Sequence, residues 1–261
     1  PSFITQPSTK YLNLKLPEGD VPVPANHDDL TPSHRHTPLV LMLVLTQVAA
    51  GLLLFDFLAR FALPSLAAPG IWHAIAGTMI AFAGLAGATL HLGRPLQAWR
   101  SFLGWRKSWL SREILVFGAW SGAAMSYVAA LLFPLPEPLL FIKGAMGAAA
   151  AGSGLLGVFC SIMVYVITKR PYWAMRQTGT RFGLTLVAAG GVFTLPLVSC
   201  LALATKLFVE FRSHSLTSSP FTHTAKVVHG PLRTTWIARI GLGIASVALL
   251  VGSVLFPPLS F

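Results

Sequence analysis

Charged residues are scarce in this chain of 261 amino acids, making up only 10% of it, and acidic residues number eight. Apolar residues make up 54%. Soluble globular domains carry about 25% charged residues. The composition therefore excludes the ordinary soluble classes and predicts an integral membrane protein.

Cysteine is also scarce. Cys160 and Cys200 each lie inside an apolar run, and no Cys-x-x-Cys spacing occurs. Zinc sites and iron–sulfur clusters need several closely spaced thiolates or imidazoles. We therefore expect no metal centre built by this chain, and we interpret both cysteines as small buried hydrophobic residues.

Histidines that face each other across two apolar runs are lacking as well. His73 and His91 lie in one run, on one helical face and near its opposite ends. The other six histidines lie outside the apolar runs. Because a membrane b-type haem needs two histidines on facing helices, we expect no haem in this chain.

Long apolar runs are what the chain does have. About 20 apolar residues cross a bilayer as a helix, and only helices or closed barrels satisfy their backbone there. The runs lack the alternation of a barrel strand. The sequence predicts an all-α polytopic helix bundle over residues 38–261, with six spans at residues 38–61, 71–92, 114–133, 139–168, 182–207 and 237–256.

Residues 1–37 are different in composition, being rich in Pro, Asp, Asn and His. Such a segment buries too little apolar surface to fold alone. Two interpretations stay open: a disordered tail, or an arm that docks on a partner subunit. The chain begins with Pro1 and ends directly after an apolar run, so we expect further chain to be missing.

Lysine and arginine are unevenly distributed among the loops. The loops after the second and fourth runs are basic, whereas those after the first and third are nearly bare. Cytoplasmic loops are enriched in Lys and Arg, so we expect these two loops and the N-terminus in the cytoplasm. Residues 209–235 would then lie outside, despite Arg212, Lys226 and Arg233. The net charge of +11 thus reflects topology and not nucleic-acid binding.

The loop after the second run joins His91 to Glu113 through a stretch rich in arginine and tryptophan. Taken singly, Glu113 could be a helix N-terminal charge paired with Arg112 or Arg94, and His91 a capping residue. An ionisable pair at membrane depth is costly, however, and indicates a functional site. A quinone suits such a pair, since its reduction takes up two protons and its carbonyl oxygens need hydrogen-bond donors. A small-solute transporter or a purely structural anchor is the alternative.

Three groups of residues resemble the membrane anchor subunit of the dimethyl sulfoxide reductase family, over about residues 38–191. Some family members have a small residue at the position of Arg94, so its role as a stabiliser of the reduced anionic quinone is our own inference. The matching residues are His91-Leu92-Gly93-Arg94-Pro95 with Ser111-Arg112-Glu113; Pro38, Gln47 and Gly51; and Val164-Tyr165 leading to Pro171-Tyr172-Trp173 and Thr178-Gly179.

This resemblance implies a subunit that is not catalytic alone but serves a quinone-linked molybdenum oxidoreductase. Its partners would be an iron–sulfur subunit and a catalytic subunit with bis-molybdopterin guanine dinucleotide, at the inner membrane of a bacterium or archaeon. The expected menaquinone or ubiquinone site comprises His91, Gly93, Arg94, Pro95, Ser111 and Glu113. Partner docking is expected at Arg100, Arg106, Lys107, Lys169, Arg170 and Arg176.

Two further expectations follow from the resemblance. Family members commonly have eight spans, so the six visible here again suggest missing chain at the C-terminus. The basic loops place the quinone site on the cytoplasmic side, which favours the sulfite dehydrogenase branch over an outward-facing sulfoxide reductase.

Overall fold

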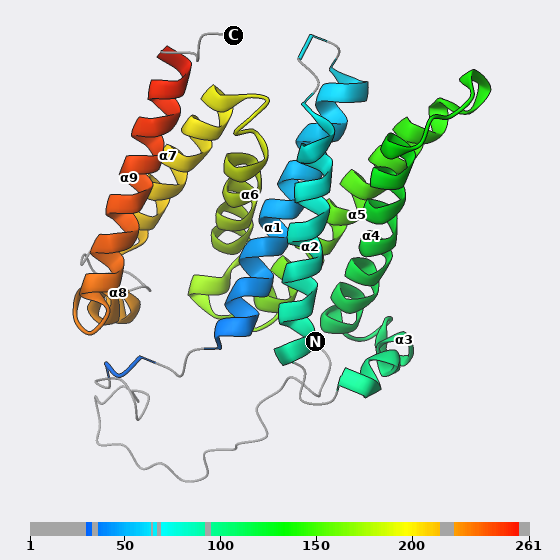
Figure 1. The fold of residues 1–261 in the computed structure, drawn as a ribbon. Coiled ribbons are helices and arrows are strands. Elements are labelled where there is room, and N and C mark those ends of the chain that lie inside the picture. Colours follow the sequence, from blue (N-terminus) through cyan, green and yellow to red (C-terminus); the bar gives the residue numbers. More distant parts are fainter. Residues whose placement is uncertain are drawn as a thin grey trace, which may run out of the picture.

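The computed structural model describes residues 30–32, 36–63, 65–66, 69–91, 95–214 and 222–255, and helices account for most of them (Figure 1). No strand occurs in these ranges. The all-α prediction is confirmed. The helices are α1 (Thr37–Phe57), α2 (Ile71–His91), α3 (Ser101–Gly104), α4 (Trp109–Leu132), α5 (Phe141–Val166), α6 (Met175–Gly190), α7 (Pro196–Ser213), α8 (Thr222–His229) and α9 (Arg233–Leu255).

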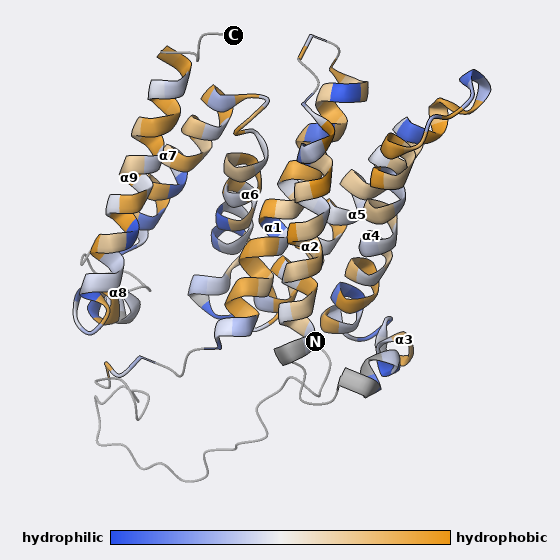
Figure 2. Ribbon diagram, viewed as in Figure 1, coloured by the Kyte–Doolittle hydropathy of each residue, from blue (hydrophilic) through white to orange (hydrophobic). Residues whose placement is uncertain are grey.

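Five helical segments are long and apolar enough to cross a membrane. They are Thr37–Ala62, Ile71–Thr89, Trp109–Leu132, Glu137–Val166 and Arg233–Leu255. Apolar residues run along these helices, while hydrophilic residues gather mostly towards their ends (Figure 2). Five of the six predicted runs therefore correspond to single helices, and the prediction of a polytopic membrane bundle is confirmed.

The remaining predicted span, at residues 182–207, is wrong. Helix α6 ends at Gly190, a turn follows, and α7 begins at Pro196 and runs back alongside α6. Pro196 occupies the first helical turn, where its missing N–H group costs nothing. Paired glycines and a proline were turn signals inside the apolar run, and they outweigh its hydropathy.

This hairpin changes where the later loops lie. Residues 95–108, 167–174 and 222–232 all lie at one end of the bundle, together with the start of α1 (Figure 1). We call this the basic end. The prediction that residues 209–235 lie on the opposite side is wrong, because the hairpin returns the chain to the basic end. Lys226 and Arg233 therefore join the other two basic loops, as the charge rule requires.

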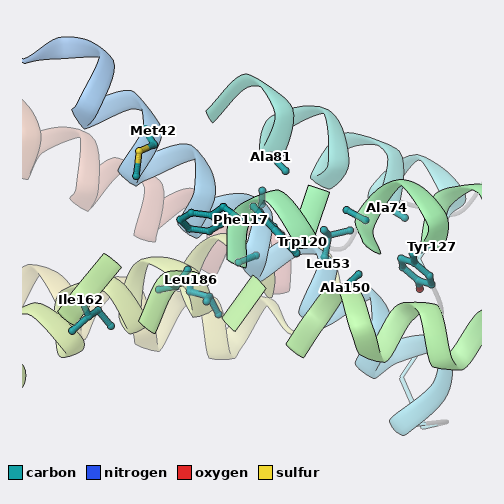
Figure 3. Close-up of a cluster of buried hydrophobic side chains, with 14 residues drawn as sticks. Met42, Leu53, Ala74, Ala81, Phe117, Trp120, Tyr127, Ala150, Ile162 and Leu186 are labelled. Carbon is teal, nitrogen blue, oxygen red and sulfur yellow. The ribbon is translucent and has the colours of Figure 1, made fainter. Parts of the chain in front are cut away.

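Helix α1 occupies the centre of the bundle and packs against α2, α5 and α6. Its Ala49, Ala50 and Leu53 are fully buried in the apolar cluster of Figure 3. It approaches α6 most closely at Gly51, where a methyl group would overlap the backbone of Leu186. The glycine of the family motif is therefore required by helix packing.

Helices α4 and α5 pack in a regular antiparallel register. Large side chains of α4 sit over glycines of α5, and a methyl group on any of these glycines would press into the facing ring. The pairs are Tyr127 with Gly147, Trp120 with Gly154, and Phe117 with Gly157. Small residues let helices approach closely in membranes, so the glycine-rich run at residues 139–168 sets the position of α4.

Gly157→Val tests this register. The added side chain should displace Phe117 and destabilise the protein by about 1–3 kcal/mol, because no open space faces Gly157. Gly152→Val is the matched control on the same helix, since nothing lies within 4 Å of a methyl group there. Thermal unfolding in detergent should show a lower midpoint for Gly157→Val than for Gly152→Val, and equal midpoints would contradict the register.

The placement of the third basic loop is testable by labelling. Single cysteines replacing Lys107, Lys169 and Lys226, in a background without Cys160 and Cys200, should react with an impermeant thiol reagent from the same membrane side. A cysteine replacing Glu137, in the loop at the other end of the bundle, should react from the other side. If the Lys226 variant instead reacted from the same membrane side as the Glu137 variant, the hairpin would be contradicted and the single span predicted at residues 182–207 would be supported.

Candidate functional site

The start of α4 is held in place by Arg112. Its guanidinium donates to the carbonyl oxygens of Trp105, at 2.8 Å, and Arg106, at 3.0 Å, just after α3. It also lies over the ring of Trp109, 4.3 Å from the ring centroid. Arg112 therefore fixes α3 on the first turn of α4, and it forms no ion pair with Glu113.

Glu113 occupies a core position on α4. Its residue exposure is 5%, and it lies one helical turn before Phe117 on the face that packs against α5. The Ser161 hydroxyl of α5 donates to Oε1 of Glu113. Among the described residues, no Lys, Arg or His lies within 4 Å of this carboxyl group. A carboxyl group buried with a single neutral donor is costly, and such residues in membrane spans indicate function.

A cluster of aromatic rings lies near Ser161. Tyr165 is one helical turn beyond Ser161 on α5. Its ring stacks on Trp173, with centroids 4.4 Å apart, and meets Phe182 edge-on at 6.1 Å. These rings join α5 to α6 and to the turn before it, one helical turn from the serine that donates to Glu113.

The structure describes only part of the predicted site. Ser111 lies in the first turn of α4, where its N–H donates to the Ser108 hydroxyl at 3.3 Å. His91 ends α2, and Pro95 begins the 3₁₀ turn Pro95–Arg100. Gly93, Arg94 and the side chains of His91 and Pro95 lie outside the described residues. The pairing of His91 with Glu113 thus stays a prediction.

The six predicted docking residues share two properties. Each is exposed, and each lies at the basic end of the bundle. They are Arg100, Arg106, Lys107, Lys169, Arg170 and Arg176.

Ser161 and Tyr165 were missed as site residues. Tyr165 belongs to a motif used for the resemblance, and it lies one helical turn beyond the serine that donates to Glu113. Ser161 lies in an apolar run, and its signal is spacing alone: it follows Gly154 and Gly157 on the same helical face.

A second buried carboxyl group lies at the opposite end of the bundle. Asp56 is fully buried and accepts hydrogen bonds from Arg60 at 2.9 Å and from the Tyr127 hydroxyl. Its Oδ1 also lies 3.2 Å from Nδ1 of His73. The spacing of Asp56 and Arg60, four residues apart on one helix, predicts an ion pair, and the structure confirms it. Because a cation and two further partners compensate this carboxylate, we interpret the cluster as a structural contact that holds α1, α2 and α4 together.

A third polar group lies between α6, α7 and α9. Arg239 donates to Glu210, and Nζ of Lys206 donates to Thr185, beside an open cavity of about 390 Å³.

Near the basic end, burial and the charge of Arg181 lower the pKa of His214. These residues are separate from Glu113. Within the described residues, no three His, Cys, Asp or Glu side chains gather as a metal site would require.

Comparison with known proteins agrees with this architecture. Residues 32–230 match the model of a family described as the DMSO reductase anchor subunit (DmsC). The chain belongs to this family. It is also 35% identical over 99 residues to a sulfite dehydrogenase subunit from Allochromatium vinosum, and the match spans 38% of this chain and 30% of that relative. No solved structure matches. The family match and the five long apolar helices together identify a multi-pass membrane protein of the anchor-subunit family.

Replacing Asp56 tests the structural role of the opposite-end cluster. Asp56→Ala leaves Arg60 and His73 without their carboxylate, so we expect destabilisation by about 3–5 kcal/mol. Tyr127→Phe removes one neutral donor and should cost about 1–2 kcal/mol. Thermal unfolding of the detergent-purified subunit measures both. If Asp56→Ala were as stable as Tyr127→Phe, the Asp56 carboxylate would not be the group that holds the three helices together.

Proposed function

We propose that this anchor subunit binds a quinone at the basic end of the bundle and exchanges electrons with an iron–sulfur partner subunit. The observation that carries the proposal is Glu113, a buried carboxyl group near the start of a membrane helix that has one neutral donor among the described residues. Its setting contrasts with that of Asp56, which has a cation and further partners.

The residues around Glu113 fit a quinone head group. When bound, a quinone supplies a carrier of two electrons and two protons. Oε1 of Glu113 accepts from Ser161, whereas Oε2 accepts no hydrogen bond from the described residues and is available to a ligand. The stacked rings of Tyr165 and Trp173 offer a flat apolar surface.

The loop before α4 completes the proposed site. His91 donates or accepts a hydrogen bond and carries a proton, while Arg94 favours negative charge on the ligand. The proposed site also includes Gly93, Pro95 and Ser111. Either menaquinone or ubiquinone fits this proposal.

The proposed assembly has two further subunits. An iron–sulfur subunit docks on the exposed Lys and Arg residues of the basic end, and it links the quinone to a catalytic subunit with bis-molybdopterin guanine dinucleotide. The relative from Allochromatium vinosum, named as part of a sulfite dehydrogenase, supports sulfite as the substrate. The location is the inner membrane of a prokaryote, with the basic end and the N-terminus in the cytoplasm.

Glu113→Gln and His91→Ala test the site in the purified complex. Both should lower quinone-linked turnover by at least about a hundredfold, because loss of a positioned proton carrier has effects of this size. Turnover of the catalytic subunit with a soluble redox dye should persist, which shows that the complex is assembled.

Glu137→Gln is the matched control. Glu137 is an exposed glutamate at the opposite end of the bundle, so its replacement should leave quinone kinetics unchanged. Wild-type quinone kinetics in both Glu113→Gln and His91→Ala would exclude the site and favour a purely structural anchor.

A further inference from the structure

The register of α4 on α5 makes the rung of Glu113 unusual. On three rungs towards the opposite end of the bundle, α5 presents glycine to an aromatic ring of α4. On the rung of Glu113, α4 presents a carboxyl group in place of a ring, and α5 presents Ser161 in place of glycine. Glu113 needs Ser161 opposite it, because a carboxyl group facing glycine would have no hydrogen-bond donor in this apolar contact.

The hydrogen bond of Ser161 differs from those of most Ser and Thr side chains in the described helices. A Ser or Thr within a helix commonly donates to the carbonyl oxygen three or four residues earlier. Ser153 on the same helix does so, with Ala149, and Thr46, Thr89, Thr180 and Ser246 follow the same pattern. Ser161 instead donates across the helix contact to Glu113.

Burial fixes this geometry. Ser161 is 2% exposed and Glu113 is 5% exposed, so neither group finds an alternative partner in bulk water. The bond occupies Oε1 and orients the carboxyl plane, which leaves Oε2 without a donor among the described residues. A ligand at this end of the bundle would therefore meet a carboxyl oxygen whose direction is set by α5.

We infer that Ser161 is a positioning residue for the quinone site and holds Glu113 in the orientation that exchanges protons and hydrogen bonds with the ligand. The inference rests on the function proposed above. It adds α5 to a site that the sequence placed between the second and third apolar runs, and it assigns the hydroxyl a role beyond packing.

The test compares four variants in the purified complex. Ser161→Ala and Ser161→Gly remove the hydroxyl, and glycine is already tolerated on the neighbouring rungs. Ser161→Thr keeps the hydroxyl. Ser153→Ala is the matched control, because it removes a serine of the same helix whose hydroxyl bonds only within α5.

Two readouts separate positioning from packing. Infrared difference spectra between two pH values, without quinone, report the carboxyl stretch that is absent from Glu113→Gln. This band should move to higher frequency in Ser161→Ala and Ser161→Gly. Quinone-linked turnover should fall roughly tenfold in both, as for the loss of a hydrogen bond to a charged group, with a changed pH profile. Ser161→Thr should restore both readouts, and Ser153→Ala should alter neither.

The inference is overturned if Ser161→Ala matches Ser153→Ala in both readouts while Glu113→Gln is inactive. It is also overturned if the band moves but turnover and its pH profile do not. Full quinone activity of Glu113→Gln would instead refute the proposed function, and the infrared band would still show whether the bond between Ser161 and Glu113 exists.

Discussion

The close contact between α4 and α5 brings a hydrogen-bond donor to each of two buried carboxyl groups, Asp56 and Glu113. Glycines on α5 let the aromatic rings of α4 approach the α5 backbone. This contact fixes the rotation of α4 about its axis and its position along that axis. That rotation turns Tyr127 towards Asp56 at one end and Glu113 towards Ser161 at the other. A small shift of α4 would leave both carboxyl groups without these donors.

Asp56 and Glu113 differ in how their buried carboxyl groups are compensated. Asp56 has a guanidinium within hydrogen-bond distance, a phenol and an imidazole, so its charge is compensated inside the bundle. Among the described residues, Glu113 has one hydroxyl donor and no cation. Since burial of a carboxyl group with so little compensation is unfavourable, this contrast with Asp56 is what supports the site proposed above.

Much of the fold was predictable because hydropathy acts over whole segments. Five spans and the ion pair of Asp56 with Arg60 follow from local patterns in the sequence. The hairpin of α6 and α7 was missed because Gly190, Gly191 and Pro196 lie within an unbroken apolar run. Averaging over that run hid a proline that suits the first turn of a helix and two glycines whose missing side chains allow close contact with Gly51 and Ser199.

The site divides in the same way. Glu113 was predictable, because an acidic residue at the start of an apolar run is conspicuous in the sequence. Its partner was not, because a serine among apolar residues is ordinary, and only the register between two antiparallel helices places it opposite a carboxyl group. Spacing on α5 does hold this information, since Ser161 continues the face of Gly154 and Gly157. The spacing becomes informative only when one knows which large residues of α4 pack against the glycines of α5. That pairing depends on both helices and cannot be obtained from the sequence of α5 alone.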